Sequence, residues 1–286
     1  MSKKNDNLYK YSVEKPWGFA VVAILYVVGA ASFPTSVFSF IPMGAKNVEL
    51  FGVALSRSLC SILTVWLMFE IKTDKLITRG ISIKNFALAL PFFVVALNNI
   101  PFFPLLLGNA AVSDGSASTV VLYLLACLGG VILEETAFRG LVFPVFLRKY
   151  DYKKYGVFLA VLISSILFGA THFVNILGGA SVGAVIMQAG YSFLVGGMCA
   201  ISEYFCGNIF IPISLHFIFN IGGLALRYEM ISGKIWTPLT VSLTAIIAVA
   251  ATVYTVIILF AGKRRETIFE RIKYISENGD PKKADL

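Results

Sequence analysis

Eight apolar segments, each about as long as a membrane-crossing helix, alternate along the chain with short segments that hold most of the charged residues. An α-helix rises about 1.5 Å per residue, so roughly 20 apolar residues cross the hydrocarbon core of a bilayer. The pattern predicts an all-α fold, a polytopic transmembrane helical bundle with about eight spans. The predicted spans are residues 17–42, 49–69, 84–107, 118–147, 155–178, 182–205, 208–226 and 236–261. We expect residues 1–286 to form a single integral membrane domain.

Composition excludes the main alternative for a chain of this length, a soluble enzyme with two domains. Of the 286 residues, 57% are hydrophobic and only 14% are charged, and the mean hydropathy is +0.80. Soluble domains carry about 25% charged residues. The chain is therefore expected to reside in a cell membrane as a multi-pass protein.

The basic residues are distributed unevenly between the two sides that eight spans would create. Nineteen of the 24 Lys and Arg residues lie before the first span, around Lys72–Lys84, around Arg148–Lys154 or from Lys263 onward. The opposite side holds only Lys46, Arg227 and Lys234. Since basic residues favour the cytoplasmic side, we predict an N-in/C-in protein with both termini cytoplasmic. Topology and anionic lipid headgroups then account for the net charge of +8, and no nucleic-acid partner is expected.

Two further patterns concern the ends and contacts of helices. Residues 263–286 are expected to form a cytoplasmic amphipathic tail, because apolar residues follow at helical spacing between Lys and Arg in KRRETIFERIKYISE. Paired glycines predict close helix approach or span ends rather than a phosphate-binding loop. They are Gly129–Gly130, Gly178–Gly179, Gly196–Gly197 and Gly222–Gly223.

The fourth predicted span contains three charged residues, Glu134, Glu135 and Arg139, at hydrocarbon depth. An ionisable group there costs at least about 2.5–3.5 kcal/mol on insertion scales, so a functional or paired role is the default expectation. Glu135 and Arg139 are four residues apart and can pair along one helix face. Glu134 then points roughly 100° away and can face the bundle interior. A purely structural ion-pair cluster between helices is the alternative.

The only two histidines of the chain also fall inside predicted spans. His172 lies in the fifth span and His216 in the seventh, where His216 and Asn220 share a helix face because they are four residues apart. Either histidine alone would suggest a hydrogen-bonded core residue. Together with the carboxylates of the fourth span, they form a polar set that can converge at an intermediate depth.

Three motifs in this set resemble those of a known family. EETAFR (Glu134–Arg139) is similar to the EExxxR motif, FGATH (Phe168–His172) to FxxxH, and HFIFN (His216–Asn220) to HxxxN/D, in the same order. These are the motifs of the CAAX protease and bacteriocin-processing (CPBP) family of intramembrane glutamic endopeptidases, whose bacterial members include self-immunity proteins. The resemblance covers a catalytic core at about residues 118–226. It implies an intramembrane endopeptidase that acts on a membrane-associated peptide or protein.

Peptide hydrolysis needs a base that activates water and donors that stabilise the oxyanion, and the polar set can supply both. We expect Glu134 to be the base, with His172 orienting the water, and His216 and Asn220 to donate to the oxyanion. Glu135 and Arg139 would support this geometry by pairing. No cofactor or metal is expected in this mechanism.

Alternatives from other classes use the same residues. Glu134, His172 and His216 could bind Zn²⁺ as two His and one Glu ligands, although the chain has no HExxH motif. A non-catalytic bacteriocin immunity or scaffold protein could bind its partner in the same polar cavity. A proton-coupled transporter would use Glu and His as relay groups, but no inverted repeat with broken helices supports it.

Overall fold

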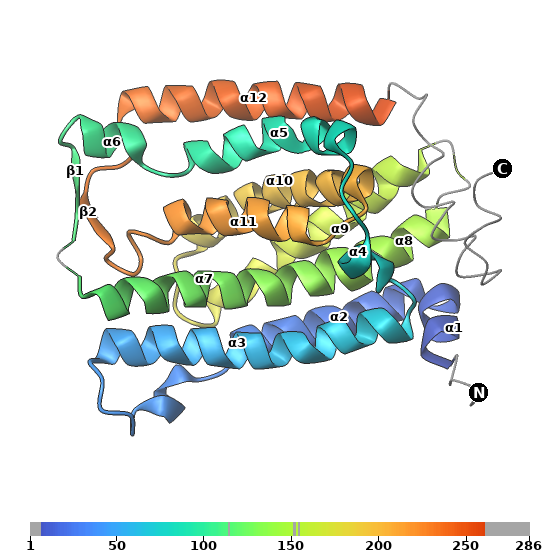
Figure 1. The fold of residues 1–286 in the computed structure, drawn as a ribbon, viewed down its shortest axis with the longest axis horizontal. Coiled ribbons are helices and arrows are strands. Elements are labelled where there is room, and N and C mark those ends of the chain that lie inside the picture. Colours follow the sequence, from blue (N-terminus) through green and yellow to red (C-terminus); the bar gives the residue numbers. More distant parts are fainter. Residues whose placement is uncertain (1–6, 114, 151–152, 154, 261–286) are drawn as a thin grey trace.

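The protein is an elongated bundle of helices that run roughly along one axis, and the computed structural model describes residues 7–260 apart from 114, 151, 152 and 154 (Figure 1). The helical segments are α1 (Asn7–Glu14), α2 (Pro16–Ala31), the 3₁₀ helix η1 (Thr35–Phe38), α3 (Ala45–Glu70), α4 (Lys75–Thr78), α5 (Ile83–Asn98), α6 (Phe102–Leu106), α7 (Ala117–Ala137), the π-helix η2 (Phe138–Val142), α8 (Phe143–Tyr150), α9 (Gly156–Thr171), the 3₁₀ helix η3 (His172–Ile176), α10 (Val182–Cys206), α11 (Phe210–Gly223) and α12 (Pro238–Phe260). Two short strands, β1 (Ala110–Val112) and β2 (Ile231–Gly233), pair antiparallel at one end. This small ribbon is the one described departure from the expected all-α fold.

Five helical segments have the length and apolar composition needed to cross a membrane, which confirms five of the predicted spans. They are α3 with 26 residues, the continuous α7–η2–α8 with 34, α9–η3 with 21, α10 with 25 and α12 with 23. A sixth is present if α1 and α2, which meet at a bend of 109°, count as one span. The number and length of these apolar helices are therefore those of a multi-pass membrane protein.

The first and third predicted spans were wrong in extent, and the seventh is shorter than predicted by two residues at its start and three at its end. The first helix ends at Ala31, well before residue 42, because Pro34 disfavours helical backbone at the preceding residue and cannot continue the helix. The third is interrupted after Asn98, where Asn99–Pro101 separates α5 from α6. The seventh is only the 14-residue α11, which ends at Gly223. Hydropathy alone did not detect these breaks.

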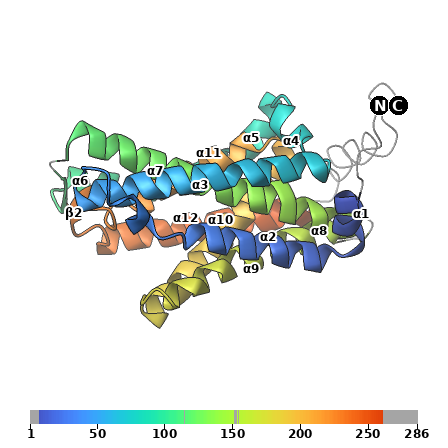
Figure 2. The same ribbon diagram turned by 90° about the horizontal axis from the view of Figure 1, so that it is seen from below.

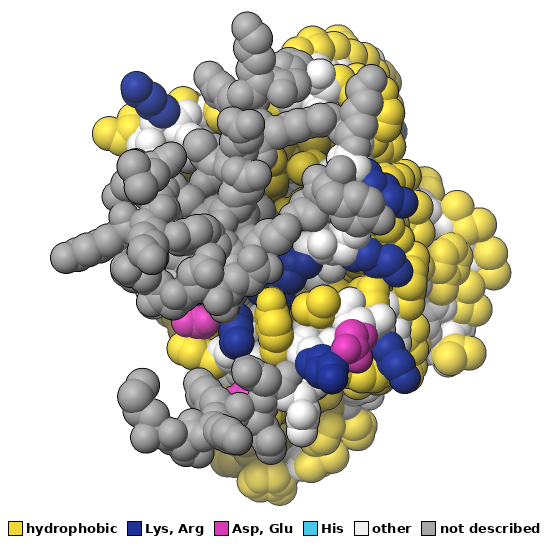
Figure 3. All heavy atoms as spheres, turned by 90° about the vertical axis from the view of Figure 1, so that its right-hand side faces the viewer, with side chains coloured by type: hydrophobic (Ala, Val, Ile, Leu, Met, Phe, Trp, Pro, Cys, Tyr) yellow, Lys and Arg dark blue, Asp and Glu magenta, His cyan; other side chains and the backbone are white. Residues whose placement is uncertain are grey.

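The first described helix, α1, and the last turn of α12 lie at the same end of the bundle (Figure 1). The loop with α4 and the end of α8 are at this end as well. Figure 3 looks onto it and shows Lys and Arg side chains between apolar ones. The described members include Lys10, Lys15, Lys75, Arg148 and Lys149. The predicted amphipathic tail at residues 263–286 lies outside the described residues.

Helix α7 is central to the bundle because it packs along α3 and α11, while α10 packs along α9. Three of the four glycine pairs lie at close helix contacts, as predicted. A Cβ at Gly129 would be 2.9 Å from the Ala54 carbonyl oxygen of α3, and one at Gly196 would be 3.3 Å from the Ser165 Cα of α9. At Gly222 it would meet the Asn99 backbone. The helices that carry the charged and polar motif residues are thus held against one another by backbone contacts.

Candidate active site

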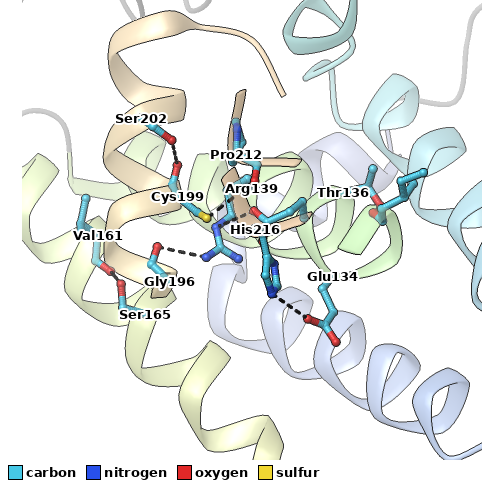
Figure 4. A network of polar contacts seen from close by, with 12 residues as sticks. Glu134, Thr136, Arg139, Val161, Ser165, Gly196, Cys199, Ser202, Pro212 and His216 are labelled. Carbon is cyan, nitrogen blue, oxygen red and sulfur yellow. Dashed lines mark hydrogen bonds and ion pairs between the residues drawn. The ribbon is translucent and has the colours of Figure 1, made fainter. Parts of the chain in front are cut away.

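A buried chain of charged groups connects α7 to α11 and α10. Glu135 Oε1 lies 2.7 Å from His216 Nδ1, and Glu135 Oε2 lies 3.1 Å from Arg139 Nε. Glu135 and Arg139 are completely buried and His216 is 5% exposed. Arg139 Nη2 donates to the Gly196 carbonyl of α10 at 3.0 Å (Figure 4). The predicted Glu135–Arg139 pair is therefore confirmed, and it extends into a network across three helices.

The π-helix η2 begins at Phe138, three residues after Glu135, and contains Arg139. A π turn places an extra residue in the helix, so it leaves a carbonyl without its usual helical partner and is frequent at functional sites. Here the Thr73 hydroxyl donates to the Gly140 carbonyl at 2.7 Å. The side chain of a neighbouring segment thus satisfies the backbone where α7 changes its winding.

Glu134 points away from this network, into the interior, as its place on the helix predicted. Its Oε2 lies 3.8 Å from His216 Nε2, on the side of the imidazole opposite Glu135 (Figure 4). Its side chain is 21% exposed, whereas that of Glu135 is completely buried. Adjacent glutamates therefore occupy different environments, one buried among partners and one open to a cavity.

Phe168, the first residue of the FxxxH motif, separates the two histidines. Its ring centroid is 5.5 Å from that of His172 and 5.7 Å from that of His216, in edge-to-face geometry. The Arg139 guanidinium lies over the same ring at 4.7 Å. His172 begins η3 directly after α9, and its Nε2 is 3.4 Å from the Ser192 hydroxyl of α10. Phe168 thus spaces the polar groups, a role that the sequence analysis did not assign.

One cavity of about 210 Å³ brings together the four residues predicted to be catalytic, Glu134, His172, His216 and Asn220. Other lining residues include Val27, Val28 and Ser32 of α2, Arg57 of α3, Asn175 of η3, Gln188, Tyr191, Ser192 and Val195 of α10, and Arg227 and Tyr228 after α11. Exposed Ser32 and Arg227 mark where the cavity meets the surface. Polar side chains from several helices thus converge on one cavity, as they do in ligand sites.

The cavity extends toward the end of the bundle opposite α1 and α8. Its α2 residues lie in the half of that helix remote from α1, and Asn175 lies at the end of the α9–η3 segment remote from α8. Figure 2 shows the junction of α9 and α10 projecting from the side of the bundle. The mouth therefore lies on the same half of the molecule as the β1–β2 ribbon.

Two charged residues of this region were missed or left without a role by the sequence analysis. Glu203 of α10 is 1% exposed. Its carboxylate has no hydrogen-bond partner within the described part of the chain, but it interacts electrostatically with Arg139. Arg57 was noted only as an arginine inside a span. The available signal for both was the presence of a charged residue inside a predicted span.

Glu134, His172 and His216 do not gather as a metal-binding set. Among the described residues, no three His, Cys, Asp or Glu side chains lie close enough together to hold an ion. His216 Nδ1 is already bonded to Glu135. No ligand geometry for zinc is therefore derived from this arrangement.

Comparison with known proteins supports the assignment made from the motifs. Residues 116–222 match the family model described as type II CAAX prenyl endopeptidase Rce1-like. No curated protein and no solved structure matches the chain. The matched segment runs from the start of α7 almost to the end of α11 and contains all six motif residues. Through residues 116–222 the chain is therefore similar to the Rce1-like family, which is consistent with the CPBP family that its three motifs resemble.

Proposed function

We propose that this protein is an intramembrane endopeptidase that hydrolyses a peptide bond with a water activated by Glu134. The convergence of Glu134, His172, His216 and Asn220 on one cavity carries the proposal. These residues come from α7, the start of η3 and α11, and are up to 86 positions apart in the sequence. The family match, whose description names a prenyl endopeptidase, supports the same reaction class.

Glu134 is the general base of the proposed reaction. Its carboxylate is partly exposed to the cavity, so it can accept a proton from water that reaches the site. His172 lines the same cavity and orients this water. The resulting hydroxide attacks the scissile carbonyl carbon, and the proton held on Glu134 then passes to the leaving amine.

His216 and Asn220 stabilise the oxyanion that forms in this attack. Glu135 is paired with Arg139 and accepts from His216 Nδ1, so the remaining donor of a protonated His216 is Nε2–H, on the cavity side. No hydrogen bond of the Asn220 side chain occurs among the described residues, which leaves its amide free to donate. Two donors fixed before substrate binds lose little free energy to reorganisation.

Glu135 and Arg139 act as positioning residues. A carboxylate bonded to the inner nitrogen of a histidine fixes the ring and stabilises positive charge on it. Arg139 in turn holds Glu135 and is anchored to the Gly196 carbonyl. Neither residue needs to touch the substrate for the reaction to depend on it.

The proposed substrate is a membrane-associated peptide or protein, since the cavity lies among membrane-length helices. A prenylated C-terminal peptide and a bacteriocin-type peptide are the two classes that the family resemblance suggests. We further propose that the protein resides in the cell membrane with eight spans and both termini in the cytoplasm. The clustering of basic side chains at one end supports this orientation (Figure 3).

The decisive experiment compares purified wild-type protein with Glu134→Gln on a tagged library of membrane peptides. Glutamine preserves size and hydrogen bonding but removes the base, so we expect cleavage to be lost while yield and melting temperature stay unchanged. Cleavage by Glu134→Gln at the wild-type rate would refute the proposal. It would instead favour the immunity or scaffold function, in which the phenotype follows protein abundance.

A chelator separates water activation by glutamate from catalysis by zinc. In the proposed mechanism, activity survives EDTA and phenanthroline, and metal analysis of the active protein finds much less than one zinc per chain. Loss of activity that added Zn²⁺ restores would instead support zinc bound through Glu134, His172 and His216.

A further inference from the structure

Two arginines line the proposed catalytic cavity without taking part in the proposed reaction. Arg57 lies within the membrane-length helix α3, and Arg227 follows the end of α11. Both line the cavity that contains Glu134, His172, His216 and Asn220. The two arginines therefore share one cavity with the proposed catalytic groups.

Arg57 is a half-buried cation whose position is enforced by packing. It lies 12 residues from the start of α3, about 18 Å along the helix, and is remote from either end. A Cβ at Gly130 of α7 would be 3.0 Å from its Nη1, so the glycine leaves room for the guanidinium. The small residue on α7 and the cation on α3 fit each other.

Arg57 forms no ion pair with any carboxylate of the described residues. The ion pairs of α7 and α11 join Glu135 to Arg139 and His216 to both glutamates, and none includes Arg57. Arg227 likewise has no acidic partner among the described residues, and its guanidinium lies 5.8 Å from the centre of the Tyr228 ring. A cation inside a span is costly unless it is paired, so an anion from outside the chain would complete this arrangement.

Tyr228 lines the same cavity, senses the charge of both arginines and adds a neutral donor. Burial raises the pKa of its hydroxyl above the ordinary value, and the charges of Arg227 and Arg57 oppose this rise. The hydroxyl therefore keeps its proton and can donate. Guanidinium and hydroxyl donors together suit a carboxylate, which accepts two parallel hydrogen bonds from an arginine.

We propose that Arg57 and Arg227 form a subsite that binds a carboxylate of the substrate peptide, and so select peptides with a negative charge close to the scissile bond. The carboxylate is either the C-terminus of the peptide or an Asp or Glu side chain, which share the same chemistry. This inference rests on the proposed function only in taking a peptide as the ligand. Binding can therefore be measured without cleavage.

The test uses Glu134→Gln protein, which retains the cavity, and three sets of fluorescent decapeptides with randomised apolar sequence. One set has a free C-terminal carboxylate, the second has a C-terminal amide, and the third has the amide and one internal Asp. We expect the first or the third set to bind roughly 10- to 100-fold more tightly than the second, the range for hydrogen bonds to a charged group. The set that binds identifies the source of the carboxylate. Equal binding of all three sets, or no binding, would overturn the subsite.

Variants assign the preference to the two arginines. Arg57→Gln and Arg227→Gln should each reduce the preference for the charged peptides and leave binding of the neutral peptides unchanged. Arg227 is exposed, so its variant keeps the test valid if Arg57→Gln fails to fold. The matched control is Lys234→Gln, which removes a basic residue from the same end of the molecule but outside the cavity. If Lys234→Gln reduces the preference as much as the arginine variants do, general surface charge explains it and the subsite is rejected.

Discussion

At the scale of single residues, the adjacent Glu134 and Glu135 have different proposed roles because the helix directs their side chains to different sides. Glu134 is open to the cavity, whereas Glu135 is held completely buried between Arg139 and His216. The same substitution should therefore affect activity alone at Glu134, and both activity and stability at Glu135. This difference is a direct test of how the polar set is arranged.

Removal of Glu135 or Arg139 should destabilise the protein as well as inactivate it. Glu135→Ala leaves Arg139 as a buried charge without its ion-pair partner, and Arg139→Ala leaves the buried Glu135 with His216 alone. Breaking a buried pair in this way costs about 3–5 kcal/mol. Thermal unfolding in detergent should show a clearly lower melting temperature for both variants and an unchanged one for Glu134→Gln. Equal melting temperatures for all three would indicate that the pair contributes nothing to folding.

Asn220→Ala should be a kinetic variant with nearly normal stability. Its side chain lines the cavity and is not part of the buried network, so little packing is lost. If its amide is one of two oxyanion donors, kcat should fall by about 10²–10³-fold while KM changes little. Asn220→Asp serves as a control that keeps the shape but loses the donor and should be equally slow. A normal kcat for Asn220→Ala would remove the residue from the proposed oxyanion site.

Local spacing predicted the residue-scale features that a single helix determines. The Glu135–Arg139 pair and the inward direction of Glu134 follow from helical geometry within α7. The Glu135–His216 contact does not, because it depends on how α7 and α11 pack across 81 sequence positions. The spacer role of Phe168 and the burial of Glu203 have the same origin in packing between helices.

At the scale of elements, glycine residues determine how closely the helices approach. Gly222 lies at the end of α11, directly against the Asn99 backbone of the α5–α6 connection. The contact places α11, which carries the proposed catalytic residues His216 and Asn220, against the break between α5 and α6.

Gly222→Ala should destabilise the bundle, because its methyl group would have to displace backbone rather than a flexible side chain. Overpacking of this kind costs about 1–3 kcal/mol. Gly29→Ala is the matched control, since no atom lies within 4 Å of a Cβ at that position in α2 and alanine favours helix. Melting temperatures in detergent should fall for Gly222→Ala and stay equal or rise for Gly29→Ala. The reverse order would contradict the close approach of α11 and the α5–α6 connection.

Hydropathy predicted the position of every long helix but not where the backbone turns. Hydropathy measures how apolar a segment is and not where its backbone bends. The predicted first span therefore continued from α2 past Pro34, and the predicted third span joined α5 to α6. Proline and asparagine at these breaks were the usable signals. The β1–β2 ribbon could not be predicted, because strands of three residues carry no resolvable periodicity.

At the scale of the whole molecule, the basic end and the cavity mouth lie at opposite ends of the bundle. Lys10, Lys75 and Lys149 belong to the end with α1, α4 and α8, whereas Ser32 and Arg227 border the cavity at the other. If the basic end faces the cytoplasm, as we propose, the cavity opens toward the outer side of the membrane. An exported peptide would then have direct access to it.

Cysteine labelling in intact cells tests this access independently of catalysis. With the four native cysteines replaced, Ser32→Cys should react with a membrane-impermeant maleimide, whereas Lys75→Cys in α4 should react only after the cells are permeabilised. Both residues are exposed, so accessibility alone does not distinguish them. Labelling of Lys75→Cys but not of Ser32→Cys in intact cells would reverse the orientation and favour a cytoplasmic substrate.

The shortness of α11 links the proposed chemistry to the thickness of the surrounding lipid. With 14 residues, this helix is only about 21 Å long, and the 16 residues of α5 reach about 24 Å, against a hydrocarbon core of about 30 Å. A bilayer adapts to such hydrophobic mismatch by thinning locally. Thinning on this side of the bundle shortens the distance that water must travel to Glu134. The supply of one reactant would then depend on the acyl-chain length of the host membrane.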